Sequence, residues 1–239
     1  MADFLVTPRL LAPDLVETVT DADIVALEPR YHERSWRELP AEIKGIALEL
    51  SAIQIMDGLT GFLQAPSSAV YVIATVVDGI SNQPITFHGQ TYRGIEEGQL
   101  LPLGPTDDPT AALTVYLREG TLPRALSFCL LVVRSNQALR DLGSLTTTLM
   151  ADDRYTKLAT LATAAATAAN PAFGTILTVA QETIGLAAEY LKVKPDDQLG
   201  YYQVNFTNRF HDLGVGPHPP GGKTMEVDKI RCSYLIRAS

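Results

Sequence analysis

The chain has 239 residues, with 19 lysines and arginines against 27 aspartates and glutamates, so its formal net charge is −8. This length fits one large domain, or one domain with a sizeable appendage. A hydrophobic fraction of 46% with 19% charged residues excludes a disordered chain. The acidic balance argues against a nucleic-acid partner, which needs a basic stripe. Two cysteines exclude a disulfide scaffold and a four-cysteine zinc module.

Residues 1–42 are predicted to form an N-terminal strap that packs across the domain. Pro8, Pro13 and Pro29 interrupt this segment, and Trp36 is expected to anchor it. The first residues combine neither a basic start nor a long apolar run, so we expect no signal peptide. The expected location is therefore cytoplasmic.

Residues 43–150 and 192–239 are predicted to form an antiparallel β-sandwich. Apolar and more polar residues alternate in the first run, which is the period of a half-buried strand. Asp57-Gly58 ends that run, and Gly89-Gln90 is expected to form the turn of a hairpin. The predicted strands cover residues 46–56, 70–77, 85–88, 91–93, 112–117, 125–133, 199–206 and 230–236. Short strands at this spacing, separated by turns, are typical of a sandwich.

Residues 151–191 break this pattern and predict an inserted α-helical hairpin. No residue from 158 to 181 is charged, and this stretch is rich in alanine and threonine. Asp152 is expected to cap the first helix. Asn170-Pro171 supplies an N-cap and a first-turn proline for a second helix, whose apolar residues recur at three-to-four spacing. Small alanines let the two helices approach closely.

The strand order resembles that of a C2 domain over roughly residues 43–237. A first strand leads to an acidic turn at Asp57, and an aromatic-bearing strand at residues 69–74 follows. Asp196-Asp197 then opens a later strand in an Asp-Asp-x-x-Gly pattern. The resemblance implies a C2-like sandwich whose loops bind calcium, lipid or protein at one end. It implies Asp57, Asp78, Asp196 and Asp197 as calcium ligands. A calcium ion needs six to eight oxygen ligands.

The chain departs from the C2 pattern after the strand at residues 125–133. Calcium-binding C2 domains carry Asp-x-Asp in the loop that follows, whereas this chain has Ser135-Asn136. Because this carboxylate pair is missing, we expect the protein to bind no cofactor. A bound calcium ion is the alternative to this expectation. The helical hairpin would be inserted between this loop and the Asp-Asp pair.

Patterns that carry catalysis are missing from the sequence. It contains no Gly-x-Ser-x-Gly and no His-Glu-x-x-His, so a non-enzymatic protein is expected. His211, Asp212 and His218 share a loop with no cysteine nearby, which favours a solvated loop over a zinc site. Cys129 and Cys232 lie in strand-like runs and are expected to be small buried hydrophobes.

These features favour a non-enzymatic interaction module that binds a protein partner or a lipid surface through its loops or its hairpin. A first alternative is a membrane-inserting or pore-forming effector that uses residues 152–191, because the uncharged stretch is long enough for a membrane helix although Pro171 divides it. A second alternative is self-assembly into a homo-oligomer through a weakly polar stripe of Thr160, Thr163 and Thr167.

Overall fold

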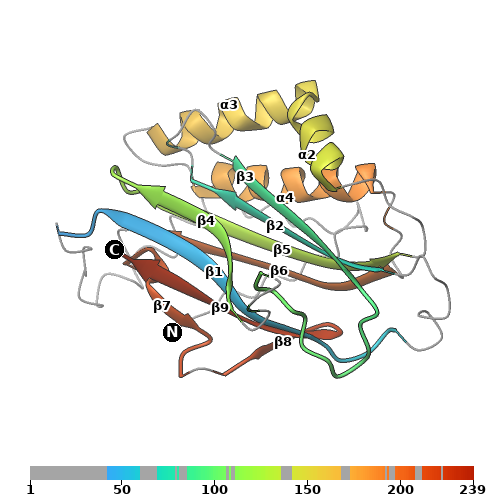
Figure 1. The fold of residues 1–239 in the computed structure, drawn as a ribbon. Coiled ribbons are helices and arrows are strands. Elements are labelled where there is room, and N and C mark those ends of the chain that lie inside the picture. Colours follow the sequence, from blue (N-terminus) through green and yellow to red (C-terminus); the bar gives the residue numbers. More distant parts are fainter. Residues whose placement is uncertain are drawn as a thin grey trace.

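Two antiparallel sheets packed face to face, with a layer of helices on one of them, make up the fold (Figure 1). The structure is a computed structural model. It describes residues 42–59, 69–78, 80, 85–105, 108, 111–135, 142–167, 173–191, 193, 197–207, 212–221 and 223–239. The predicted mainly-β sandwich with inserted helices is confirmed. The predicted strap at residues 1–42 lies, except for Glu42, outside the described residues.

The first sheet contains the beginning and the end of the described chain. Its strand order is β4-β1-β9-β7, and β8 also pairs with β9. These strands are β1 (Gly45–Ile55), β4 (Leu113–Glu119), β7 (Gly216–His218), β8 (Met225–Val227) and β9 (Ile230–Ala238). Period-two burial along β1 places Ile46, Leu48 and Leu50 on the face that packs against the second sheet.

The second sheet has the strand order β3-β2-β5-β6. Its strands are β2 (Ala69–Val77), β3 (Ile85–Arg93), β5 (Ala125–Ser135) and β6 (Gln198–Thr207). Every residue of β2 is buried, because this strand has the other sheet on one face and helices on the opposite face. This double burial explains why the β2 sequence is almost continuously apolar and β-branched.

Aromatic and aliphatic side chains from both sheets fill the core between them. Phe128 of the second sheet lies 5.2 Å, centroid to centroid, from Tyr234 of the first. The hydroxyls of Tyr202 and Tyr234 hydrogen-bond to each other at 3.0 Å, so the polar ends of these buried rings have partners. His218 stacks on Tyr234 at 4.8 Å and bonds the Gly214 carbonyl through Nε2.

Among the residues described between β5 and β6, three helices cover the outer face of the second sheet (Figure 1). They are α2 (Leu142–Met150), α3 (Asp153–Thr167) and α4 (Phe173–Tyr190). Helix α4 lies on β2 and β5, and α3 packs on α4. The insert begins with α2, which was not predicted, so the helical part of the chain is longer than residues 151–191.

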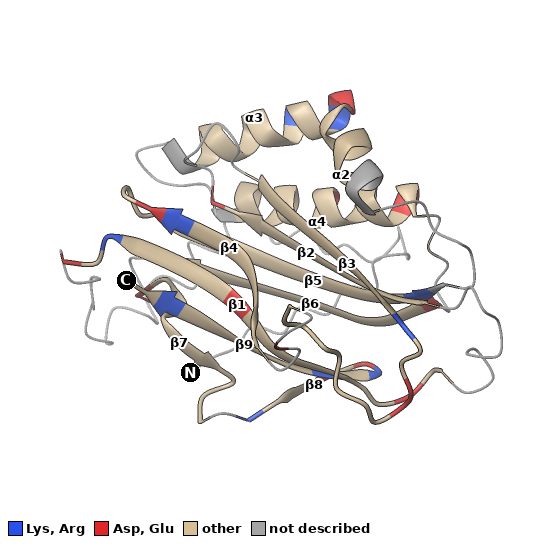
Figure 2. Ribbon diagram, in the orientation of Figure 1, with Lys and Arg blue, Asp and Glu red and all other residues tan. Residues whose placement is uncertain are grey.

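The uncharged stretch at residues 158–181 is explained largely by burial. Ile176, Val179 and Ala180 of α4 are at most 2% exposed, as is Ala162 of α3. They belong to a second core shared with the outer face of the second sheet. Charged residues lie mostly near the ends of helices and strands (Figure 2). No helix in the described part of the chain is long and apolar enough to cross a membrane.

The predicted hairpin at Gly89-Gln90 is wrong, because β3 is one continuous strand through both residues. All nine residues of β2 pair with β3, from Ala69 opposite Arg93 to Val77 opposite Ile85. Gly89 therefore lies opposite Ile73 in mid-strand, where the long partner strand keeps the backbone extended.

Candidate interaction surface

Loops from both sheets meet at one end of the sandwich, which we call the loop end. Strands β1, β3 and β5 finish there, and β2, β6 and β9 begin there. Backbone hydrogen bonds join the loops to one another. Met56 N donates to the Lys229 carbonyl at 2.7 Å, Lys229 N donates to the Leu199 carbonyl at 2.9 Å, and Gly98 N donates to the Ile55 carbonyl at 2.7 Å.

The structure brings two of the four predicted calcium ligands to the loop end. Asp57 is exposed, and its carboxylate accepts a hydrogen bond from Gly58 N at 2.6 Å. Asp197 is partly buried just before β6. Asp196 lies outside the described residues. Within the described ranges, no group of three or more His, Cys, Asp or Glu side chains is placed to hold a metal ion.

Asp78 lies at the opposite end of the sandwich, where β2 finishes, so it does not join Asp57 and Asp197. Its buried carboxylate accepts hydrogen bonds from Tyr116 OH and Arg118 Nη1, both at 2.8 Å. Burial, together with the Asp78 charge, raises the pKa of Tyr116 far above its usual value. Since Tyr116 and Arg118 belong to β4, this carboxylate ties the two sheets together.

Arg134, at the end of β5, connects the loops that carry Asp57 and Asp197. Its Nη1 donates to the Gly58 carbonyl, and its Nε lies 3.9 Å from Asp197 Oδ1. The chain thus places a fixed guanidinium where the resemblance to C2 domains implies a bound cation. Arg134 was not singled out from the sequence, because Gly58 is 76 positions away from it and Asp197 lies beyond the helical insert.

Gly58 is required by the geometry of the same loop. Its φ of 94° is in the left-handed region, which side chains disfavour. A Cβ at this position would lie 3.0 Å from Leu199 Cδ2 and 3.0 Å from Lys229 Cδ. The missing side chain therefore lets the Lys229 stem lie over the turn, and a second cation joins Arg134 at the loop end.

A groove of about 380 Å³ lies beside these loops, along the edge of β3. Its lining residues are Gln90, Thr91, Tyr92, Arg93, Ile95, Pro102, Gly104 and Pro105. Successive side chains of a strand point to opposite faces of the sheet, so a hollow lined by four consecutive strand residues must follow the strand's edge. β3 is the outer strand of its sheet, and no strand in the described residues pairs with this edge.

Two residues of the groove carry polar groups that other parts of the described chain do not engage. Arg93 is exposed and forms no ion pair with a described residue. Tyr92 is 5% exposed, and its hydroxyl has no hydrogen-bond partner among the residues that the structure describes. Burial raises the pKa of Tyr92, so this hydroxyl keeps its proton at neutral pH.

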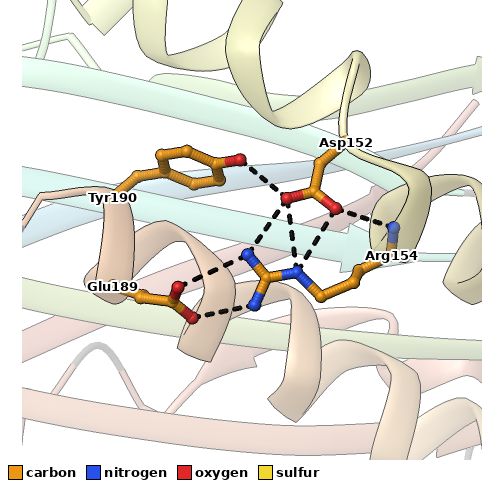
Figure 3. Close-up of polar contacts among 4 residues, drawn as sticks. All are labelled: Asp152, Arg154, Glu189 and Tyr190. Carbon is orange, nitrogen blue, oxygen red and sulfur yellow. Dashed lines mark hydrogen bonds and ion pairs between the residues drawn. The ribbon is translucent and has the colours of Figure 1, made fainter.

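A separate polar cluster joins the start of α3 to the end of α4 (Figure 3). Asp152 caps α3 as predicted, since its Oδ1 accepts a hydrogen bond from Arg154 N at 2.7 Å. Tyr190 OH donates to Asp152 at 2.6 Å, and Arg154 Nη1 donates to Glu189 at 2.9 Å. Hydrogen bonds from Arg154 and Tyr190 hold the pKa of Asp152 well below its usual value. These contacts fix one helix against the other, which is a structural role.

The two cysteines are buried, as predicted. Cys129 and Cys232 are at most 1% exposed, and burial raises the pKa of each thiol to about 12. Both therefore stay protonated at neutral pH and pack as small apolar side chains. Among the residues of the predicted solvated loop, His218 lies against Tyr234, while His211 is outside the described residues.

No protein-family model matches the chain, and no curated protein matches its sequence. The resemblance to C2 domains and the calcium site that it implies therefore stay predictions. The loop end and the groove are defined by geometry alone. Sequence reasoning missed the groove residues because the false hairpin placed Gln90 in a turn and Thr91 at the start of a new strand.

Proposed function

We propose that the protein is a non-enzymatic interaction module that binds a partner protein at the loop end, with the groove beside β3 as the contact surface. The observation that carries this proposal is the open groove along the edge of β3, which pairs with no strand in the described part of the chain. Unpaired edges expose backbone donors and acceptors that readily pair with another chain, so proteins commonly cover or blunt them. Here the edge is accompanied by a hollow and by exposed Arg93.

The fixed loops beside the groove support this role. Leu59 N donates to Glu97 Oε1 at 2.7 Å, and Gln54 Nε2 donates to the Gly98 carbonyl at 2.5 Å. These bonds attach the turn after β3 to the end of β1. Part of the chain between β3 and Pro102 of the groove is therefore held in place. A preformed surface loses less conformational entropy on binding than a mobile one.

The packing of the hairpin favours this proposal over membrane insertion. Ile176, Val179 and Ile184 of α4 are at most 2% exposed within the second core. Insertion of α4 into a bilayer would strip these side chains from the sheet. The sheet residues that α4 covers, such as Ile73 and Leu131, would then face water, at a cost of about 25 cal/mol per Å² of apolar surface exposed.

The threonine stripe gives little support to self-assembly. The hydroxyls of Thr160 and Thr163 donate to the carbonyls of Thr156 and Ala159, one turn earlier in the same helix, at 2.9 and 3.0 Å. Hydroxyls used in this way are less free to bond a second copy. The side chain of Thr167 lies outside the described residues.

Site-specific photo-crosslinking tests the proposal in the cell of origin. A benzoylphenylalanine in place of Thr91, which lines the groove, should crosslink a partner protein. The matched control replaces Thr156, which is equally an exposed threonine but lies on α3. The same crosslinks from both positions, or none from Thr91, would overturn the proposal. Co-sedimentation with anionic vesicles identifies a lipid surface as the partner instead, and that outcome also counts against it.

A further inference from the structure

We propose that the groove receives an extended peptide segment of the partner as an additional strand on β3, with an acidic side chain of that segment beside Arg93. This inference rests on the proposed function and names the chemistry of the partner. It depends on three features of the described residues: the strand edge, the two faces of β3, and the charge of Arg93.

The backbone of β3 offers the hydrogen bonds that a new strand needs. One edge of β3 pairs with β2 over all nine residues. In such a ladder the N–H and C=O groups of alternate residues point to the other edge. That edge has no partner strand among the described residues, and the groove runs along its last four residues. Helix α2 contacts β3 but contributes no lining residue to the groove. Main-chain bonding to a free edge is a common mode of peptide recognition.

The two faces of β3 set the side-chain pattern of the bound segment. Ile85 belongs to the core under the helices, so Thr91 and Arg93, at even spacing from it, share that face. Tyr92 belongs to the core between the sheets, and Gln90 shares its face. Segment residues opposite Gln90 and Tyr92 would therefore lie over the groove, where the lining also includes Ile95, Pro102 and Pro105.

An apolar residue of the bound segment suits the positions opposite Gln90 and Tyr92, and an acidic residue suits the position opposite Arg93. The guanidinium of Arg93 is exposed and forms no ion pair with a described residue. Directly opposed charges on neighbouring strands attract, and like charges repel. Glu97 does not pair with Arg93, and its Oε1 accepts a hydrogen bond from Leu59 N. The segment thus alternates acidic or polar residues with apolar ones.

Two synthetic peptides test this pattern and the strand direction together. The acetylated and amidated sequence Thr-Glu-Val-Thr-Val-Thr places Glu opposite Arg93 in an antiparallel arrangement, and its reversed sequence does so in a parallel one. Binding is followed by NMR titration of the full chain. We expect one of the two peptides to bind, and its Glu-to-Lys version to bind about tenfold more weakly. A version N-methylated at alternate amides, on the side that pairs with β3, should lose binding.

Charge exchange supplies the matched variants. Arg93→Glu should reverse the preference, so that the Lys peptide binds better than the Glu peptide. Lys157→Glu makes the same change of net charge on exposed α3 and should leave both affinities unchanged. An unchanged preference in Arg93→Glu would overturn the acidic contact, because the preference for the Glu peptide would then come from a group other than Arg93.

The strand itself is tested by amide hydrogen exchange. Bound peptide should protect outward amides within residues 90–93. Strand addition is overturned if neither peptide binds at concentrations up to about 1 mM. A dissociation constant of that size corresponds to a binding free energy of only about −4 kcal/mol. If the photo-crosslink from Thr91 then persists, the proposed function stands and the partner uses another contact geometry. If the crosslink is lost as well, both proposals fall.

Discussion

Replacing Asp78 with alanine should destabilise the protein by about 3–5 kcal/mol, the usual cost of removing one partner of a buried ion pair. The Asp78 carboxylate is 3% exposed and Arg118 is 17% exposed, so little water reaches either charge. Two hydrogen bonds of 2.8 Å would be lost, from Tyr116 OH and from Arg118 Nη1. At about 1.5–3 kcal/mol for each hydrogen bond to a charged group, the two bonds account for about 3–6 kcal/mol, which overlaps that range.

Urea unfolding followed by far-UV circular dichroism measures this loss of stability. The control is Glu49→Ala, which breaks the ion pair of Glu49 with Arg237 at 2.7 Å. Arg237 is 61% exposed, so the control should lose no more than about 1 kcal/mol. A loss below about 1 kcal/mol in Asp78→Ala would refute the conclusion that this carboxylate ties the two sheets together. A calcium response that disappears in this variant would instead support Asp78 as a metal ligand.

Three further predictions concern other parts of the molecule. Thr75→Val should raise the free energy of unfolding by about 1 kcal/mol, since the buried Thr75 hydroxyl has no partner among the described residues; a destabilised variant would show that the hydroxyl is bonded. Desolvation lowers the pKa of His88 below 6.5, so the folded state resists its protonation and stability should fall as the pH drops below 6.5. The pH dependence of stability should weaken in His88→Gln, and an identical pH profile in this variant would show that His88 is not its source. Calcium should leave the melting temperature unchanged relative to chelator, because Arg134 already engages the loop at Gly58; a site at 100 times its dissociation constant would add about 2.7 kcal/mol.

The strands of the sandwich were accessible from sequence because their burial is periodic or complete. β1 alternates and β2 is apolar throughout, and both patterns are local. The two long helices were accessible for the same reason, since Asp152 and the spacing of apolar residues mark them. Helix α2 was missed because its sequence has no charged residue in its first or last turn to mark an end.

The candidate surface could not be predicted, because it depends on contacts between distant residues. Arg134 bonds a carbonyl 76 positions away, and Leu59 N bonds the Glu97 side chain 38 positions away. Gly89-Gln90 predicted a turn from the local sequence alone, but β3 stays extended there because it pairs with β2 along its whole length. The edge of a sheet, and therefore the groove, is defined only when the order of the strands is known.

Hydrogen exchange of the full chain, with and without the partner captured from Thr91, tests the central claim most directly. The proposed function predicts that partner binding slows exchange in residues 90–93 and leaves the exposed side of α3 unchanged. Slowed exchange in α3 without any change in residues 90–93 would contradict it, because the partner would then bind the helical layer and the groove would have no part in recognition.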